Sequence, residues 1–414
     1  MLKNLRAKLR WPSAKSRKHA LCVLPWLHLH VGVDGNAFPC CVALNGKPLG
    51  SLRHSSAVDL FNAKPLRQLR RDMMAGVRNS YCQHCYTIED ANGTSLREVF
   101  NKYFAQHADE VERTSPDGSV DPEKIVYLDV RFSNLCNLRC RSCGSAASTA
   151  WYQDDPHTAP KDFRIVRPTA SPERLWAEIE PFLGRAEKLH FAGGEPMMMD
   201  ETYQTLERLL EIGRTDVALT YNTNASTWTH RDWDVLELWK SFKNVTVMAS
   251  VDGSGARGEY IRKGMNWRKI IENCKRVRRE CPDAWFQLNF TIGLMNALHL
   301  PDFLDECLAE GLIEADRLDL NFIQHPVHLS LTSLPPALKA NVRRLYGERI
   351  AELRLSETGK VMAHRMRAAI DYMDSRDTTS ELGKFRRFTR DLDQKRGESF
   401  VETFPELAEL MSVG

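Results

Sequence analysis

Residues 129–143 read DVRFSNLCNLRCRSC, in which Cys136, Cys140 and Cys143 have the spacing C-x3-C-x2-C directly after a predicted strand. The spacing puts three thiolates on one compact loop, where they can hold three irons of a cubane cluster and leave the fourth iron without a protein ligand. An open iron can bind a substrate or a cofactor. The alternative is a structural zinc ion, which needs four closed ligands, but no fourth donor lies nearby in the sequence. The loop therefore predicts an iron–sulfur cluster with one open position.

The chain around this loop alternates between strand patterns and helix patterns. From Ile125 onward, β-branched apolar runs alternate with periodic segments of helical length. The predicted strands lie near residues 125–132, 188–192, 217–222, 244–250, 285–292 and 316–323. Six strand-then-helix units with right-handed crossovers predict an α/β fold, a partial (β/α)6 barrel whose chemistry gathers at the C-terminal ends of its strands. A doubly wound sheet is the alternative.

Glycine-rich or polar residues follow several of these predicted strands. The relevant segments are Ala192-Gly193-Gly194-Glu195-Pro196, Tyr221-Asn222-Thr223-Asn224, Ser250-Val251-Asp252-Gly253 and Tyr260-Ile261-Arg262-Lys263-Gly264, with Ile323 at the end of the last strand. Glycines let backbone groups approach a ligand closely, although a Gly-Gly turn also serves as a tight strand-to-helix connection. An arginine can pair a carboxylate through its planar fork or simply lie on the surface. The strand ends therefore supply candidate ligand contacts.

A second cysteine-rich segment precedes the predicted barrel. Its cysteines are Cys22, Cys40, Cys41, Cys82 and Cys85. A turn signal at residues 34–36 separates two β-like runs, 26–33 and 37–42, and an apparent helix covers residues 57–74. Four thiolates can converge in such a unit, and C-x2-C pairs occur both in iron–sulfur domains and in four-cysteine zinc ribbons. The segment predicts a small α+β module that binds metal.

The organisation of the chain changes near residue 124. We expect the metal-binding module over residues 20–92, a helical linker over 93–123, the partial barrel over 124–330 and a helical C-terminal region over 331–414. In the last region the helical patterns cover residues 338–375 and 381–392. The first 18 residues carry seven basic and no acidic side chains, which indicates a solvated tail rather than a transit peptide.

The composition is that of an ordinary globular protein. The chain has 414 residues, of which 43% are hydrophobic and 27% charged, so it can bury a sizeable core. No apolar run approaches the roughly 20 residues that cross a bilayer, and we expect no membrane partner. The net charge of +3 carries no clear signal for nucleic acid.

The 11 cysteines indicate a reducing compartment. Their odd number, in a long chain without a secretion signal, favours metal-binding or catalytic thiols and a cytoplasmic location. Cys274, Cys281 and Cys307 stand apart from the two clusters and lie among apolar residues, at helical spacing for Cys274 and Cys307, so we expect them in the core.

The three-cysteine loop resembles the signature of the radical S-adenosylmethionine (radical SAM) enzymes. The resemblance implies that the open iron chelates the amino and carboxylate groups of S-adenosylmethionine. An electron then cleaves the sulfonium, and a 5′-deoxyadenosyl radical abstracts a hydrogen atom from the substrate. One departure is Ser142, where the family usually has an aromatic residue. We therefore do not expect this side chain to stack on the adenine.

The same resemblance implies roles for the residues at the strand ends. The segment of Gly193, Gly194, Glu195 and Pro196 would hold the methionine amino group. Asn222 or Asn224 would contact the cofactor, as would Ser250 and Asp252. Arg262 would pair the carboxylate, and Ile323 would pack on the adenine.

Residues 20–90 resemble the twitch, or half-SPASM, domain that holds an auxiliary 4Fe-4S cluster in many radical SAM enzymes. By that match the ligands are Cys22, Cys40, Cys82 and Cys85, with Cys41 as a spare or a substitute. The domain commonly follows the barrel, whereas here it precedes it. A fully ligated cluster could accept an electron from a substrate radical, one with an open iron could hold the substrate, and either could support the fold.

The resemblance implies a radical SAM oxidoreductase or maturase. Relatives with this kind of domain modify the side chains of ribosomally made peptides or dehydrogenate small molecules such as aminoglycosides, and we favour a peptide or protein substrate. A sugar or aminoglycoside is the alternative. The expected electron donor is a reductase such as flavodoxin or ferredoxin. A non-catalytic iron–sulfur or zinc scaffold, or an electron carrier, is the hypothesis of another class, but it would leave Gly193, Gly194 and Arg262 without a role.

Overall fold

The computed structural model describes residues 19–43, 46–90, 94–160 and 162–412, which divide into two compact units. The first unit contains the described residues up to Ser133 together with 166–193 and 204–218. The second contains 134–165, 194–203 and the described residues from Leu219 onward. The predicted basic tail lies outside the described residues.

The first unit contains five strands in the order β6-β4-β1-β2-β3. They are β1 (His28–Val31), β2 (Asn36–Phe38), β3 (Gly50–Ser51), β4 (Tyr127–Val130) and β6 (Lys188–Phe191). Strand β4 is parallel to both β1 and β6, while β2 is antiparallel to β1 and β3. The first strand of the cysteine-rich segment therefore pairs directly with the strand that leads into the three-cysteine loop.

Two predicted boundaries in the cysteine-rich segment were wrong. Trp26 belongs to the short helix α2 (Leu24–Leu27), because Pro25 in the first helical turn favours helical backbone. The predicted helix over 57–74 is two helices, α3 (Ala57–Phe61) and α4 (Lys64–Met74). Pro65 at the start of α4 explains the break, because proline has no N–H to donate to the carbonyl of Phe61, four residues earlier, and so cannot continue α3.

The remaining helices of the first unit lie at the end of the cysteine-rich segment, in the predicted linker and after the first barrel strand. They are α5 (Gln83–Asp90), α6 (Leu96–Tyr103), α7 (Ala108–Glu112) and α8 (Pro172–Leu183). Ser95 caps α6 and also forms a capping box with Glu98. Helix α9 (Asp200–Glu211) follows β6. Helix α8 comes after β4 and α9 after β6, as a βαβ repeat requires.

The larger strands of the second unit have the order β13-β12-β10-β7, and two two-stranded sheets, β11-β5 and β8-β9, lie in the same unit. The larger strands are β7 (Ala218–Thr223), β10 (Asn244–Ser250), β12 (Trp285–Ile292) and β13 (Leu318–Phe322). The short ones are β5 (Arg139–Cys140), β8 (Thr229–His230), β9 (Trp233–Asp234) and β11 (Arg262–Lys263). Strand β12 is parallel to β10 and β13. Helices α10 (Val235–Trp239), α11 (Gly255–Ile261), α12 (Trp267–Glu280) and α13 (Leu300–Ala309) lie between these strands in the chain. The six predicted strands are thus β4, β6, β7, β10, β12 and β13, which confirms the α/β fold of the partial-barrel kind.

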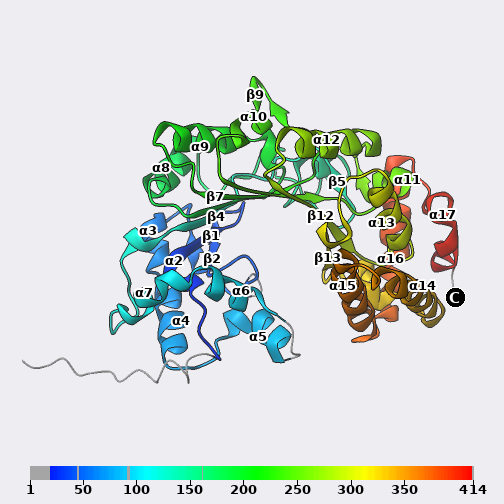
Figure 1. The fold of residues 1–414 in the computed structure, drawn as a ribbon, viewed down its shortest axis with the longest axis horizontal. Helices are drawn as coiled ribbons and strands as arrows, with labels where there is room; N and C mark the ends of the chain where they lie inside the picture. The colour runs from blue at the N-terminus through cyan, green and yellow to red at the C-terminus, as the bar shows by residue number, and fades with distance from the viewer. Residues whose placement is uncertain (1–18, 44–45, 91–93, 161, 413–414) are drawn as a thin grey trace, which may run out of the picture. The chain divides into compact units, whose positions relative to one another are not determined.

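The C-terminal region is helical, as predicted. Its helices are α14 (Pro336–Leu353), α15 (Glu357–Asp374), α16 (Leu382–Arg396) and α17 (Phe400–Thr403). Helices α14 and α15 lie side by side, and α15 also packs on β13 (Figure 1). The predicted helical segment 338–375 is divided into α14 and α15, because Ser356 caps a new helix by accepting a hydrogen bond from the backbone N–H of Gly359.

None of the described helices has the length and apolarity needed to cross a membrane. Cys274, Cys281 and Cys307 are buried, as predicted.

A short two-stranded sheet in the second unit includes part of the three-cysteine loop. Strand β5 (Arg139–Cys140) pairs antiparallel with β11 (Arg262–Lys263), and Cys140 lies opposite Arg262. Residues 140 and 262 are far apart in the chain, so this sheet brings the cysteine loop to the segment that follows α11.

Candidate functional site

The loop of Cys136, Cys140 and Cys143, called the ligand loop below, is a hydrogen-bonded turn. The backbone N–H of Cys143 donates to the carbonyl of Cys140 over 2.9 Å. Cys140 is buried, Cys136 is half-buried and Cys143 is exposed. The three cysteines thus differ in exposure, although the side chains of Cys140 and Cys143 are hydrogen-bonded to each other.

Arg262 is the charged side chain next to these thiols. Its Nη1 lies 3.7 Å from Cys140 Sγ, and its Nε donates to Asp252 Oδ2 over 2.8 Å. Burial lowers the pKa of Arg262, but Asp252 and Cys140 outweigh burial and raise it, so the guanidinium stays charged. A hydrogen bond from Cys143 and the charge of Arg262, acting against burial, lower the pKa of the Cys140 thiol to about 7. This favours the thiolate, which is the form that binds metal.

The surface position that was the alternative for Arg262 is ruled out, because the residue is only 9% exposed. Asp252 also accepts a hydrogen bond from the backbone of Thr291 over 2.8 Å. The end of β10 and the end of β12 therefore fix the carboxylate that orients Arg262.

The turn after β6 packs directly on the ligand loop. The backbone N–H of Glu195 donates to the carbonyl of Leu135 over 2.7 Å. A Cβ atom on Gly194 would lie 2.2 Å from the same oxygen, so only glycine fits there. Gly193 has a φ of 127°, a conformation that also favours glycine. Pro196 begins the short turn that follows.

The carboxylate of Glu195 is buried and accepts several hydrogen bonds. Thr223 Oγ1 and the backbone N–H of Asn224 each donate to it over 2.6 Å. Burial raises the pKa of Glu195 to about 7, although these hydrogen bonds oppose the rise. A buried carboxyl with this pKa can switch between an acceptor and a donor near neutral pH.

Of the two candidate asparagines, Asn224 lies against the ligand loop. Its Nδ2 is 3.8 Å from Cys136 Sγ and donates to Asn137 Oδ1 over 2.9 Å. Asn222 lies within β7, and Ser250 is the last residue of β10, opposite Asn289 in β12.

Ile323 and Ser142 meet at one small cavity. The cavity is also lined by Asp252, Thr291 and Arg141. Ile323 packs against Gly293, where an added Cβ would lie 2.7 Å from Ile323 Cδ1. The last barrel strand and the ligand loop therefore border the same space, and the small side chain of Ser142 leaves room in it.

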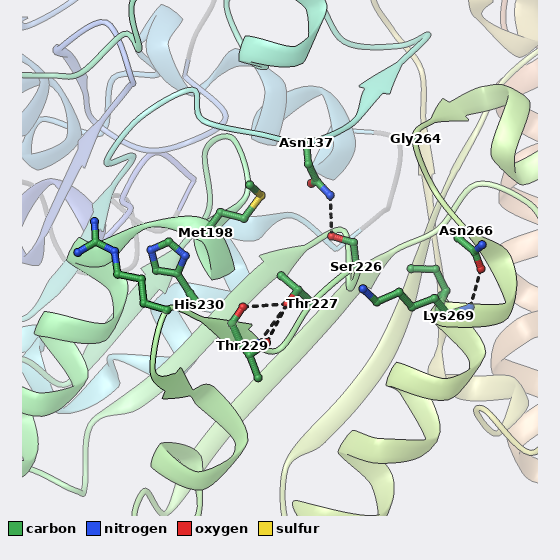
Figure 2. Close-up of a pocket in the computed structure, with 11 residues that line it drawn as sticks. Asn137, Met198, Ser226, Thr227, Thr229, His230, Gly264, Asn266 and Lys269 are labelled. Carbon is green, nitrogen blue, oxygen red and sulfur yellow. Dashed lines mark hydrogen bonds between the residues drawn. The ribbon is translucent and has the colours of Figure 1, made fainter.

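A larger polar pocket of about 340 Å³ opens on another side of the ligand loop (Figure 2). Asn137 lies in its wall and donates to Ser226 Oγ over 3.0 Å. Lys269 and Arg231 add positive charge to the lining. Sequence reasoning missed this pocket, since its residues come from separate loops without a recognisable motif.

The five N-terminal cysteines line a single small cavity in the first unit. Cys22, Cys40, Cys41, Cys82 and Cys85 share it with apolar side chains such as Leu24 and Phe100. Burial and the neighbouring Cys85 raise the pKa of Cys82 to about 12, and burial, Cys41 and Cys22 raise that of Cys40. Metal binding to such thiols releases their protons, because the bound form is the thiolate. The clustered thiols fit a cationic metal centre.

Within the described part of the chain, no three His, Cys, Asp or Glu side chains are placed to share one metal ion.

Comparisons with known proteins identify the two domains. The model of the radical SAM superfamily matches residues 130–307. The model of SPASM, an iron–sulfur cluster-binding domain, matches residues 22–86. A search of curated proteins finds no match.

Several solved structures align with this chain at low sequence identity and low TM-score. Native anSMEcpe with bound AdoMet and Cp18Cys peptide is 16% identical, with a TM-score of 0.38, over 54% of this chain and 59% of that one. Streptococcus suis SuiB bound to S-adenosylmethionine is 13% identical, with a TM-score of 0.40, over 78% and 69%. SuiB bound to precursor peptide SuiA is 12% identical, with a TM-score of 0.35, over 92% and 73%. The chain thus spans about three fifths of the first of these structures.

The two matched domains coincide with the two groups of cysteines. The cofactors of such domains are 4Fe-4S clusters and S-adenosylmethionine. The clusters agree with the prediction from the cysteine spacing, and S-adenosylmethionine agrees with what the family resemblance implied. The chain carries a radical SAM domain, matched over residues 130–307, and ahead of it a SPASM iron–sulfur cluster-binding domain, matched over residues 22–86.

Proposed function

We propose that this protein cleaves S-adenosylmethionine reductively and uses the 5′-deoxyadenosyl radical to abstract a hydrogen atom from a peptide or protein side chain. The observation that carries this proposal is the convergence of separate strand ends on the ligand loop. Asn224 after β7 lies against Cys136, and Arg262, oriented by Asp252 after β10, lies against Cys140. Glu195 after β6 is bonded to Leu135 in the same loop.

Each of these residues has a proposed role. Cys136, Cys140 and Cys143 hold a 4Fe-4S cluster that, once bound, supplies the electron and the open iron. Glu195 accepts a hydrogen bond from the methionine amino group, with Gly193, Gly194 and Pro196 shaping the turn. Arg262 pairs the methionine carboxylate, and Asn222 or Asn224, Ser250 and Asp252 complete the contacts. Ile323 borders the space for the adenine.

The N-terminal cysteines are proposed to hold an auxiliary 4Fe-4S cluster. The thiol of Cys40 interacts electrostatically with Cys41, Cys22 and Cys82, and that of Cys41 interacts with Asp129, Arg131 and Cys85. We propose Cys22, Cys40, Cys82 and Cys85 as the ligands, with Cys41, which lines the same cavity, as a spare or a substitute. Because the barrel supplies the residues for cofactor cleavage, we assign the auxiliary cluster to the turnover of substrate.

The SPASM domain is compatible with a peptide substrate, which we favour, and also with a small molecule. We propose flavodoxin or ferredoxin as the source of the electron and the cytoplasm as the location. Dehydrogenation of a sugar or an aminoglycoside is the competing substrate class.

The test is cofactor cleavage by the anaerobically reconstituted protein. With dithionite and S-adenosylmethionine we expect 5′-deoxyadenosine, detected by chromatography and mass spectrometry. Changing Cys136, Cys140 and Cys143 to alanine should abolish it and leave iron in the N-terminal module, while Cys274→Ala, a change of a buried core cysteine, should keep it.

Two results would contradict the proposal. Undiminished cleavage by the triple variant would remove the ligand loop from the reaction. Absence of 5′-deoxyadenosine from the wild type would favour a non-catalytic scaffold or electron carrier. The substrate class is tested with peptide and aminoglycoside substrates deuterated at carbon, because only the true substrate transfers deuterium into 5′-deoxyadenosine.

A further inference from the structure

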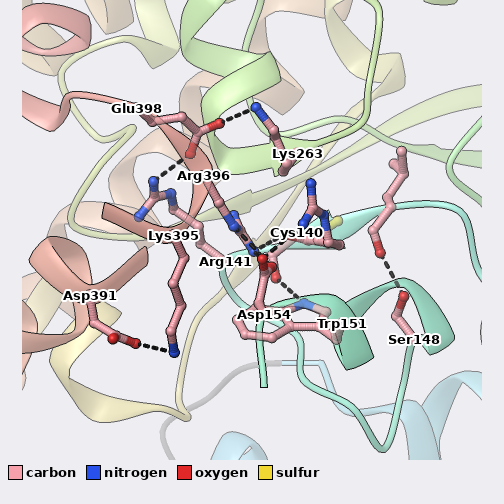
Figure 3. Close-up of polar contacts among 12 residues, drawn as sticks. Cys140, Arg141, Ser148, Trp151, Asp154, Lys263, Asp391, Lys395, Arg396 and Glu398 are labelled. Atoms are coloured by element: carbon pink, nitrogen blue, oxygen red, sulfur yellow. Dashed lines mark hydrogen bonds and ion pairs between the residues drawn. The ribbon is translucent and has the colours of Figure 1, made fainter. Parts of the chain in front are cut away.

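A network of buried charges joins the ligand loop to the C-terminal helix α16 and to the turn after it (Figure 3). Arg141, between the second and third ligand cysteines, is 1% exposed. Its Nη2 donates to Asp393 Oδ1 over 2.6 Å and to Glu398 Oε2 over 2.7 Å. Its guanidinium carbon lies 3.6 Å from the ring centre of Tyr260.

A second arginine reaches the loop from the end of the same helix. The side chain of Arg396 is completely buried, and its Nη2 donates to Asp154 Oδ2 over 2.7 Å and to the carbonyl of Arg139 over 2.8 Å. Asp154 in turn accepts a hydrogen bond from Arg139 Nη1 over 2.8 Å. Arg396 therefore holds the peptide group that directly precedes the ligand Cys140.

The neighbouring peptide groups of the loop are held as well. The carbonyl of Leu138 accepts from Ser148 Oγ over 2.6 Å, and that of Cys140 accepts from Trp151 Nε1 over 2.9 Å. The backbone N–H of Arg141 donates to the carbonyl of Ile261 over 2.8 Å. The path of the backbone around Cys140 is thus fixed at successive residues.

The network continues into the turn after α16. Asp393 also accepts hydrogen bonds from Tyr260 Oη over 2.6 Å and from the backbone of Phe400 over 2.8 Å. Lys263, next to Arg262, pairs with Glu398 at 2.9 Å. The same carboxylates therefore bind the ligand loop, strand β11 and the C-terminal segment.

We propose that helix α16 and the turn after it, residues 382–404, are part of the cofactor site, where Asp393, Arg396 and Glu398 position the ligand loop. The inference rests on the proposed function, because it assumes that the loop holds a cluster with an open iron. The radical SAM model ends at residue 307, so this role lies outside the matched domain.

Arg141 gives the network a second connection to the site. It lines the small cavity that also contains Ser142 and Ile323, and its Nη1 has no hydrogen-bond partner among the described residues. A buried donor without a partner is costly, so the proposal includes a hydrogen bond from Arg141 Nη1 to a ligand in this cavity. The C-terminal carboxylates thus also hold a donor at the space proposed for the nucleoside of S-adenosylmethionine.

The alternative is that the network only attaches the C-terminal helix to the barrel. In that case its loss lowers the thermal stability but leaves the properties of the cluster unchanged. If the network positions the loop, its loss changes how the loop binds iron and S-adenosylmethionine.

The experiment compares Arg396→Gln, Arg396→Lys and Asp393→Asn with the matched control Lys395→Gln. Lys395 is the neighbour of Arg396, but it pairs with Asp391 on its own helix at 2.8 Å (Figure 3). Three properties of the cluster in the ligand loop are measured. They are the rate at which it loses iron to a chelator, its midpoint potential, and the change that S-adenosylmethionine makes in its electron paramagnetic resonance (EPR) spectrum.

For Arg396→Gln and Asp393→Asn we expect at least fivefold faster iron loss, a shifted potential and at least fivefold weaker binding of S-adenosylmethionine. Arg396→Lys keeps the charge but loses the planar guanidinium that reaches both Asp154 and Arg139. Its rate of iron loss and its affinity for S-adenosylmethionine should therefore lie between those of the wild type and of Arg396→Gln. For the control Lys395→Gln, the rate of iron loss and the affinity for S-adenosylmethionine should stay within twofold of the wild-type values.

The inference is overturned if Arg396→Gln matches Lys395→Gln in every cluster readout, even when its thermal stability falls. If Arg396→Gln does not fold, Asp393→Asn and Arg396→Lys are compared with Lys395→Gln in the same cluster readouts, and equal values again overturn the inference. Failure of the proposed function has a different signature, because the wild type itself would then show no EPR change with S-adenosylmethionine, and that result overturns both.

Discussion

At the scale of single residues, the site depends on buried charges that have partners. Arg262 pairs with Asp252, and Arg141 pairs with Asp393 and Glu398. Removing one member of such a pair leaves a charge buried without compensation, which typically costs about 3–5 kcal/mol. Burial strengthens these charge interactions. Burial also makes the free energy of unfolding depend on the protonation of buried groups.

His299 gives a prediction about pH. Its Nε2 lies 3.1 Å from Ser254 Oγ, just after the segment that carries Asp252, and its Nδ1 lies 3.3 Å from Arg257 Nη1. Burial and the charge of Arg257 lower the pKa of His299 from 6.5 to about 4. Below pH 6.5 the unfolded chain therefore takes up a proton before the folded protein does.

We expect this residue to reduce the free energy of unfolding as the pH falls from 6.5 to 4, by about 3 kcal/mol at most. Denaturant unfolding at pH 7 and pH 5 measures the effect. His299→Gln should lose less stability than the wild type over this interval, whereas the exposed control His364→Gln should behave like the wild type. An unchanged pH dependence in His299→Gln would exclude His299 as the source.

At the scale of elements, the turn after β6 and the ligand loop touch through their backbones. Gly194 lies against Leu135, and the adjacent Glu195 is hydrogen-bonded to the same carbonyl. A backbone neighbour cannot swing away as a flexible side chain can, so the contact sets how closely the two loops approach.

Gly194→Ala should force these two loops apart. We expect a loss of about 1–3 kcal/mol in the free energy of unfolding, typical of overpacking, together with lower iron uptake by the ligand loop. Gly184→Ala is the matched control, because an added Cβ there meets no atom within 4 Å. Chemical unfolding and iron analysis compare the two variants, and equal stability with full iron in Gly194→Ala would show that the loops can adapt.

At the scale of the whole molecule, the two groups of cysteines belong to different compact units. The N-terminal cysteines lie in the first unit and the ligand loop lies in the second. The residues proposed for cofactor cleavage that contact the loop, such as Arg262 and Asn224, are in the second unit. The two metal centres should therefore be separable by mutation.

Cys82→Ala combined with Cys85→Ala should lower the iron content by up to about half if both centres are cubanes. It should keep cleavage of S-adenosylmethionine without substrate and stop formation of the product. Metal analysis and the 5′-deoxyadenosine assay measure these effects. Zinc in the wild type, with no iron lost in the double variant, would identify a structural zinc ribbon. If the double variant loses both cleavage of S-adenosylmethionine and soluble expression, the metal centre chiefly stabilises the fold of the domain.

The sequence by itself determined the ligand loop and the order of the barrel strands. Cysteine spacing within a short loop limits which metal centre it can hold, and strand and helix periodicity is a property of neighbouring residues. These signals are local, so Cys136, Cys140 and Cys143 and the six strands could be found without a structure. The helix breaks at Pro65 and Ser356 also depend on local signals, a proline and a capping serine that interrupt an otherwise helical pattern.

Only the tertiary structure decided which polar residues surround the loop. It placed Asn224 against Cys136, buried Arg262, and joined Arg141 to Asp393 across 252 residues of chain. A charged helix such as α16 has the same sequence pattern whether its carboxylates face solvent or a buried arginine. The partner of such a side chain is set by the packing of distant segments, which no local pattern records.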